Sequence, residues 1–274
     1  MALAQPALAV DVQGHCGARG HLPENTLPGF ERALQLGATT LELDVGVTRD
    51  GVVVVHHDRA LNPDLARGPD GAWIAAPGPL IKDLSFAELQ RYDVGRIRPG
   101  SEYAKRFPQQ AALDGARIPR LAQVLAQPAR FNIETKLSAD APHETLPPEP
   151  FARALIAEVR TADAAARTTI QSFDWRTLKV VEREAPEIAT AYLTGSRDAE
   201  PEAVHAAGGR IWSPDFTTLT PHKLAAARRL GLKLIPWTVN EPADIARVLA
   251  MRVDGIISDY PDRVRAELKP RGMP

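Results

Sequence analysis

The chain alternates short apolar runs with stretches whose apolar residues recur at helical spacing. Ranges 27–36, 221–230 and 241–251 place their apolar residues on one face and predict amphipathic helices. The predicted strands are Val10–Gly14, Thr40–Val45, Val52–His56, Phe131–Lys136, Thr168–Phe173, Ala189–Thr194, Arg210–Pro214, Leu232–Val239 and Gly255–Ser258. This alternation is typical of α/β proteins with a parallel sheet, and eight such strands closed into a TIM-type (β/α)8 barrel fit it.

Nine predicted strands compete for eight places, so one must lie elsewhere. Arg49-Asp50-Gly51 is a tight-turn signal, which predicts a hairpin between the strands on either side. With Asp50-Gly51 as a two-residue loop, Asp44 would face His57 and set a carboxylate beside an imidazole.

The range 59–119 interrupts the alternation and is rich in Pro, Gly and Arg. A structureless loop of this length is improbable in a compact domain. We therefore predict a small inserted cap with one helix near Ser85–Tyr92, within a single domain spanning 1–274. A second Pro-rich stretch, Ala141–Pro150, predicts a surface loop.

Composition narrows the class of protein. The 274 residues, 44% of them hydrophobic, are enough for one large core, and the formal net charge of −1 argues against a dedicated nucleic-acid or acidic-membrane binder. Cys16 is the single cysteine, which excludes an internal disulfide and a cysteine-based zinc site. No apolar run approaches the roughly 18 residues that cross a bilayer, so no stable membrane insertion is expected.

The first residues leave two interpretations open. Ala-Leu-Ala at 7–9 resembles the end of a secretory signal, yet a basic region and sufficient apolar length are missing. The range is either part of an export signal or a short lead-in. We favour an exported protein, periplasmic or secreted, with a cytoplasmic location as the alternative.

Two carboxylates share one face of a predicted strand. Glu42 and Asp44 are two residues apart in an otherwise apolar run, so their side chains leave the same face. A hard divalent cation such as Mg²⁺ or Ca²⁺ would relieve their repulsion. The alternative is a solvated outer face, which the covering helices of a parallel barrel disfavour.

The same alternation returns in Phe131–Lys136, where Asn132, Glu134 and Lys136 share a face. Glu134 is a candidate third metal carboxylate, and Lys136 could bind a phosphate oxygen or pair with a carboxylate. The alternative is a buried Glu134–Lys136 ion pair with only a structural role.

Two histidines end predicted strands. His15 follows the first strand and His57 follows the run after the turn, so both would lie at the rim where barrels of this type carry their sites. An imidazole pair can transfer protons to and from phosphodiester oxygens near neutral pH. His56 is a weaker candidate because alternation turns it away from the face of His57.

Together these residues form an ordered series that resembles the glycerophosphodiester phosphodiesterase family. The series is His15-Cys16-Gly17, Pro23-Glu24-Asn25-Thr26, Glu42-Leu43-Asp44-Val45, Thr48-Arg49-Asp50-Gly51, His57-Asp58, Asn132-Ile133-Glu134-Thr135-Lys136, Gln171-Ser172-Phe173, Pro236-Trp237-Thr238-Val239-Asn240 and Asp254-Gly255-Ile256-Ile257-Ser258-Asp259. Each motif alone is weak evidence, but their order across nearly the whole chain makes the resemblance specific.

The resemblance implies a TIM barrel, acid–base work by His15 and His57, and one divalent cation, Mg²⁺ or Ca²⁺, held by Glu42, Asp44 and Glu134. It also implies cleavage of small glycerophosphodiesters to glycerol 3-phosphate and an alcohol, through attack by the substrate's own hydroxyl and hydrolysis of a cyclic phosphate. Trp237 is a candidate wall for the glycerol moiety or, alternatively, a core residue.

One position departs from the family pattern, which has His-Arg-Gly where this chain has His15-Cys16-Gly17. A thiol offers neither the charge nor the fork of an arginine that binds phosphate. Arg19 or Lys136 could supply the cation, activity could be reduced, or the chain could bind without turnover; we expect reduced activity. Cys16 is a candidate phosphate neighbour, and a reactive thiol if cations surround it.

Two rival functions remain. A related lipid phosphodiesterase, phospholipase D-like or phosphatidylinositol-cleaving, would also use a metal and paired histidines. A non-catalytic protein that binds a phosphate ligand would keep the site without the turnover.

Overall fold

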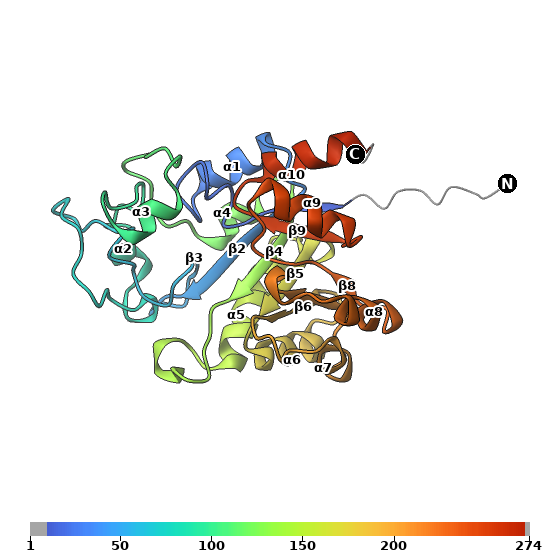
Figure 1. The fold of residues 1–274 in the computed structure, drawn as a ribbon. Helices are drawn as coiled ribbons and strands as arrows, with labels where there is room; N and C mark the ends of the chain where they lie inside the picture. Colours follow the sequence, from blue (N-terminus) through green and yellow to red (C-terminus); the bar gives the residue numbers. More distant parts are fainter. Residues whose placement is uncertain (1–9, 272–274) are drawn as a thin grey trace.

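Residues 10–271 are described by a computed structural model, in which a ring of parallel strands is surrounded by helices (Figure 1). The predicted leader lies outside these residues. The strands are β1 (Asp11–Gly14), β2 (Thr40–Val47), β3 (Val53–Val55), β4 (Arg130–Thr135), β5 (Thr168–Ser172), β6 (Ala189–Thr194), β7 (Ile211–Pro214), β8 (Lys233–Leu234) and β9 (Gly255–Ser258).

The parallel strands follow the order β8-β7-β6-β5-β4-β2-β1-β9. The Asp254 N–H donates to the Leu234 carbonyl at 2.9 Å and the Ile257 N–H to the Pro236 carbonyl at 3.0 Å, which joins the two ends of the sheet. The TIM-type barrel predicted from the sequence is confirmed.

Apart from α2 and α3, which belong to the segment 59–119 beside the barrel, the helices cover the outside of the barrel (Figure 1). The helices are α1 (Leu27–Gln35), α2 (Phe86–Leu89), α3 (Glu102–Arg106), α4 (Leu121–Leu125), α5 (Pro148–Thr161), α6 (Trp175–Glu184), α7 (Pro201–Ala206), α8 (Pro221–Arg229), α9 (Pro242–Ala250) and α10 (Pro261–Leu268), with short 3-10 turns at Ile81–Asp83, Pro142–Glu144, Ala165–Arg167, Phe216–Thr218 and Lys269–Arg271. The start of α1 shows why the sequence predicts them: Thr26 accepts a hydrogen bond from the Gly29 N–H, and a proline occupies the first turn.

Two predicted boundaries are wrong. The segment Leu232–Val239 contains only the two-residue β8, because Pro236 has no N–H to continue the ladder. The stretch Ala141–Pro150 is not all loop: a 3-10 turn occupies Pro142–Glu144, and α5 already begins at Pro148.

The predicted hairpin exists, but its register differs by one residue. β3 pairs antiparallel with β2 through Val45 opposite Val55 and Val47 opposite Val53. The loop therefore holds three residues, ending at Gly51 with a φ of +79°, as hairpins of this length commonly do. Asp44 consequently faces His56, whose N–H donates to the Asp44 carbonyl at 2.9 Å, and not His57.

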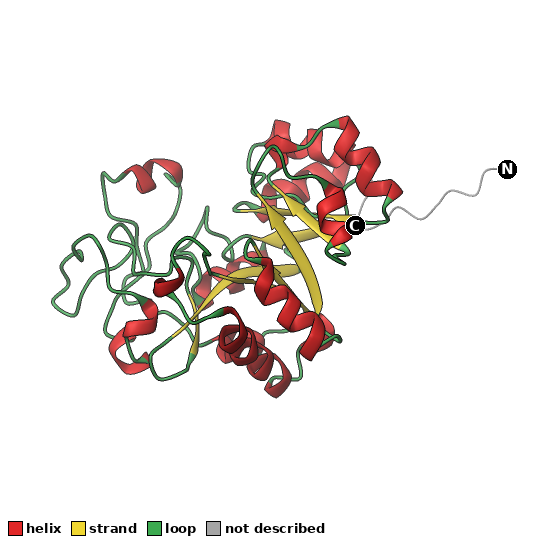
Figure 2. Cartoon of the chain, turned by 90° about the horizontal axis from the view of Figure 1, so that it is seen from below, coloured by secondary structure: helices red, strands yellow, loops and turns green. Residues whose placement is uncertain are grey.

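The segment 59–119 lies beside the barrel on the side of β3 (Figures 1 and 2). It has a small apolar core that includes Leu61, Ile81 and Leu89, packed under Val54 of β3. The predicted helix is present as α2, capped by Ser85 with Glu88 in a capping box. A further helix, α3, was not predicted.

The main core fills the space between the strands and the outer helices, with Phe30, Phe131, Tyr192 and Trp212 among its largest fully buried side chains. Within residues 10–271, no helix combines the length and apolar character needed to span a bilayer.

Gly17 lies in the turn after His15, where its backbone packs closely against that of Gly29. Replacement of Gly17 tests this close contact. A Cβ at Gly17 (φ +88°) would meet the Gly29 backbone carbon at 2.8 Å, whereas a Cβ at Gly51 (φ +79°) would meet nothing within 4 Å. We expect Gly51→Ala to lower the free energy of unfolding by about 1–2 kcal/mol through its left-handed backbone. Gly17→Ala should lower the free energy of unfolding by about 1–3 kcal/mol more than Gly51→Ala does, because its methyl group overpacks the turn. Urea denaturation measures both, and equal losses would contradict the tight contact.

Candidate active site

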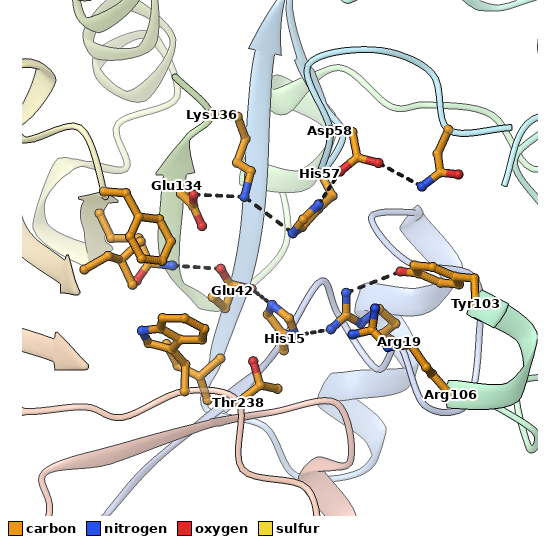
Figure 3. A pocket seen from close by; sticks show the side chains of 16 residues that line it. His15, Arg19, Glu42, His57, Asp58, Tyr103, Arg106, Glu134, Lys136 and Thr238 are labelled. Carbon is orange, nitrogen blue, oxygen red and sulfur yellow. Dashed lines mark hydrogen bonds and ion pairs between the residues drawn. The ribbon is translucent and has the colours of Figure 1, made fainter. Parts of the chain in front are cut away.

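A pocket of about 410 Å³ opens where the loops after the barrel strands meet the inserted segment. Its charged lining includes His15, Glu42, His57, Glu134 and Lys136, which Figure 3 shows grouped around one space. The opposite walls differ in character. Phe173, Leu193, Trp237 and Ile257 form an apolar side, and Arg19, Tyr103 and Arg106 form a polar one.

The structure brings the three predicted carboxylates together. Asp44 of β2 lies beside Glu134 of β4 in the sheet register, and Glu42 projects from the same strand face. One oxygen from each of these acids lies within 4.8 Å of the others. Their exposed fractions of 1%, 0% and 7% for Glu42, Asp44 and Glu134 exclude the alternative of a solvated strand face.

Lys136 is the cation closest to this carboxylate cluster. Its Nζ lies 2.9 Å from Glu134 Oε1 and 3.4 Å from Asp44 Oδ1. Burial opposes ionisation of Asp44, but Lys136 and the two histidines outweigh it and lower the pKa of this acid. Burial and the neighbouring Asp44 raise the pKa of Glu42, and burial also raises that of Glu134. One lysine therefore does not neutralise three acids, and the ion pair alone does not account for the cluster.

The donor set fits a hard divalent cation. Asp44 Oδ1 is buried and accepts no hydrogen bond from any residue in the range 10–271. Carboxylate oxygens gathered at this spacing are the ligands that Mg²⁺ and Ca²⁺ prefer. The cluster of Glu42, Asp44 and Glu134 could therefore hold one such ion.

His15 reaches the pocket from the end of β1. Its Nδ1 lies 2.8 Å from Asp259 Oδ1 and 3.0 Å from Arg19 Nη2, while its Nε2 lies 3.9 Å from Glu42 Oε2. A proton on Nδ1 is donated to Asp259 and leaves Nε2 free to accept one from the pocket. Burial and Arg19 lower the pKa of His15, so its neutral form is favoured.

His57 reaches the same space from the end of β3. Its Nδ1 lies 2.7 Å from Asp58 Oδ1 and its Nε2 3.4 Å from Lys136 Nζ. Burial lowers the pKa of His57, but Asp44 and the hydrogen bond to Asp58 outweigh it, so the net shift is upward. His56 does not line the pocket; its Nε2 lies 3.4 Å from the Ala60 carbonyl oxygen.

Cys16 lies below the pocket floor and does not line it. The thiol is fully buried and donates to Asp44 Oδ2 at 3.2 Å, and the backbone N–H donates to Glu42 Oε2 at 3.0 Å. Burial and Asp44 raise the pKa of Cys16 well above its ordinary value. The structure places Cys16 outside the pocket lining, and burial and Asp44 outweigh the nearby Arg19 in raising the pKa of its thiol. The predicted phosphate contact and reactive thiol stay predictions, without support from this geometry.

Arg19 and Trp237 do line the pocket. The Arg19 Nε donates to Asp259 Oδ1 at 2.7 Å, and its guanidinium lies 4.8 Å from the centre of the Phe107 ring. Trp237 packs edge-on against Phe173, with 5.4 Å between ring centres. Both predicted residues, with Lys136, thus face the space where a substrate would lie.

Several pocket residues were missed. Asp259 and Asp58 hold the two histidines, and both stand in motifs recognised in the sequence, directly after a strand and directly after His57. Tyr103 and Arg106 come from the inserted segment, and no sequence pattern places them here. Only the packing of that segment against the barrel does so.

Comparison with known proteins identifies the family. The family model described as "Glycerophosphoryl diester phosphodiesterase family" matches residues 15–263. The chain belongs to this family. It is therefore an enzyme of the phosphoric diester hydrolase class, as the resemblance implied.

Relatives match along almost their whole length. A glycerophosphodiester phosphodiesterase of Caldanaerobacter subterraneus subsp. tengcongensis is 31% identical over 257 residues, which cover 92% of this chain and 94% of that protein. One from Bacillus subtilis is 30% identical, covering 90% and 83%.

Solved structures share the fold. A candidate glycerophosphoryl diester phosphodiesterase from Silicibacter pomeroyi superposes with a TM-score of 0.92 at 37% identity, covering 98% of this chain and 96% of that one. An Oleispira antarctica phosphodiesterase in complex with its product, sn-glycerol-3-phosphate, gives a TM-score of 0.75 at 23% identity, covering 95% and 97%.

Metal binding to the carboxylate cluster can be measured without turnover. At a concentration of 100 times Kd, a cation that binds only the folded chain adds about 2.7 kcal/mol of stability. For a chain of this size the Tm should then rise by about 5–10 °C. Glu42→Gln should abolish most of this shift. Glu24→Gln changes an acid outside the cluster that contacts Tyr103, and it should retain the shift. Equal shifts in all three proteins would contradict the assigned site.

Proposed function

We propose that this enzyme hydrolyses small glycerophosphodiesters to glycerol 3-phosphate and an alcohol, with one divalent cation, Mg²⁺ or Ca²⁺. The observation that carries the proposal is a pocket lined by two imidazoles and by Glu42 and Glu134, with the buried Asp44 clustered beside these two acids, in a member of this family. Relatives at 30–31% identity bear the name of this activity.

Glu42, Asp44 and Glu134 would hold the cation. When bound, it would offset phosphate charge and make the attacking hydroxyl more acidic. Each imidazole has its Nδ1 fixed by a carboxylate, Asp259 or Asp58, so each presents Nε2 to the pocket. One accepts the proton of the substrate's own glycerol hydroxyl and the other protonates the departing alkoxide, with a cyclic phosphate as the product of this first step.

Lys136 and Arg19 replace the arginine missing at position 16. Both line the pocket, and Lys136 Nζ lies between Glu134 and His57, near the centre of the site. Arg19 approaches from the side of His15. Trp237 and Phe173 offer a flat apolar wall for the carbon face of glycerol.

The activity is tested by release of glycerol 3-phosphate from glycerophosphocholine in a coupled assay with added Mg²⁺ or Ca²⁺. His15→Ala and His57→Ala should each lower kcat by about 10²–10⁴-fold because proton transfer is lost. The control His21→Ala removes a histidine that pairs with Asp262 outside the pocket and should retain activity.

Absence of product from the wild-type enzyme on every glycerophosphodiester would contradict the proposal and favour a non-catalytic binder. Faster turnover of lysophosphatidylcholine than of glycerophosphocholine would instead favour a lipid phosphodiesterase.

We further propose that the buried, neutral Cys16 leaves activity lower than an arginine would. Cys16→Arg should raise kcat/KM for glycerophosphocholine, by up to about 10²-fold if the guanidinium recovers a transition-state contact. Cys16→Met adds length without charge and controls for bulk at this fully buried position. An unchanged or lower rate in a correctly folded Cys16→Arg enzyme would refute the idea.

A further inference from the structure

Three amide side chains form a hydrogen-bonded line through the interior of the barrel. Gln13 of β1, Asn132 of β4 and Gln171 of β5 lead from Asp11, at the amino end of β1, to Glu42 in the carboxylate cluster. The three amides have exposed fractions of only 1–3%. Buried amides of this kind are costly unless their hydrogen bonds are made.

Each member of this amide line is hydrogen-bonded to the next. Gln171 Nε2 donates to Glu42 Oε1 at 2.7 Å, and Gln13 Nε2 donates to Asp11 Oδ2 at 2.9 Å. Between them, Asn132 Nδ2 donates to both glutamine carbonyls, to Gln13 at 2.8 Å and to Gln171 at 2.9 Å.

The two acids at its ends dictate the direction of every amide. An ionised carboxylate only accepts, so Gln13 and Gln171 must turn their NH₂ groups outward to Asp11 and Glu42. Their carbonyls then face Asn132, which must donate with both of its N–H bonds. Asn132 Oδ1 is buried and has no hydrogen-bond partner among the described residues.

We propose that the amide line is a positioning network that fixes the carboxylate of Glu42 for the cation, an inference that rests on the metal site of the proposed function. Gln171 donates to Oε1 and the Cys16 N–H donates to Oε2 at 3.0 Å, so both oxygens are held. Gln171 can donate to Glu42 in one amide orientation only, and the hydrogen bond that its Oε1 accepts from Asn132 reinforces that orientation. Residues that hydrogen-bond to metal ligands typically change metal affinity by about 10–100-fold when removed.

The experiment measures Mn²⁺ affinity of the purified full-length protein by isothermal titration, without substrate. Gln171→Met keeps length and loses the donor to Glu42, and it should raise Kd by about 10–100-fold. Asn132→Leu keeps an approximate shape at a position that lies opposite Glu42 in the sheet but makes no side-chain hydrogen bond to it. It should raise Kd by about 3–10-fold, less than Gln171→Met, because it acts on Glu42 through Gln171. Gln13→Met, farthest from the cluster, should change Kd least.

Ser172→Ala is the matched control, because Ser172 is equally buried on β5 and hydrogen-bonds to Thr135 away from the carboxylates. It should leave Kd within about two-fold while lowering Tm. A network that only stabilises the barrel would lower the Tm of every variant and leave Kd unchanged, which would overturn the inference. If Asn132→Leu fails to fold, the comparison of the Mn²⁺ Kd of Gln171→Met with that of Ser172→Ala decides the question alone. A wild-type protein that binds no Mn²⁺ would overturn the metal site itself and this inference with it.

Discussion

Burial of like charges is the constraint on which the site depends. Glu42, Asp44 and Glu134 lie within 4.8 Å of one another at almost no exposure to solvent, an arrangement that costs several kcal/mol unless positive charge or hydrogen-bond donors offset it. The surrounding chain supplies donors to Glu42 from Gln171 and the Cys16 backbone, and to Asp44 from Asn25 and Cys16. Several of the sequence motifs of this chain thus supply the donors that keep these acids together.

The two histidines are also held by hydrogen bonds, here with a carboxylate as the partner of each ring. Each Nδ1 meets its own carboxylate, Asp259 for His15 and Asp58 for His57, and these acids are in turn fixed by Asn240 and Asn62. The acids themselves have lowered pKa values because, against burial, Arg19 and His15 favour the charge on Asp259 and His57 favours that on Asp58. The carboxylate at Nδ1 therefore orients each imidazole and favours a proton on that nitrogen, which leaves Nε2 for proton transfer.

The sequence predicts those parts of the site that follow from local pattern, and it does not predict the parts that depend on tertiary contacts. The faces of Glu42, Asp44 and Glu134 follow from strand alternation, and their convergence follows from the barrel. The hairpin register was missed because the loop closes on Thr48, whose hydroxyl accepts from the Val52 N–H at 3.0 Å, and local pattern does not reveal such a choice. Cys16, at a φ of +48°, does not line the pocket, whereas Arg106 of the inserted segment does. Both placements depend on tertiary packing, which the periodicity of the sequence does not reveal.

Cys16 shows how the charge balance of the site favours a divalent ion. Its thiol stays neutral because burial and Asp44 raise its pKa, so Lys136 is the cation in contact with the carboxylate cluster. Fully ionised, the three acids and Lys136 carry an excess of two negative charges, which one divalent cation neutralises. Without it, the upward pKa shifts of Glu42 and Glu134 favour their protonated forms. Because a cation binds the ionised carboxylates, protons compete with it for these acids and its affinity depends on pH.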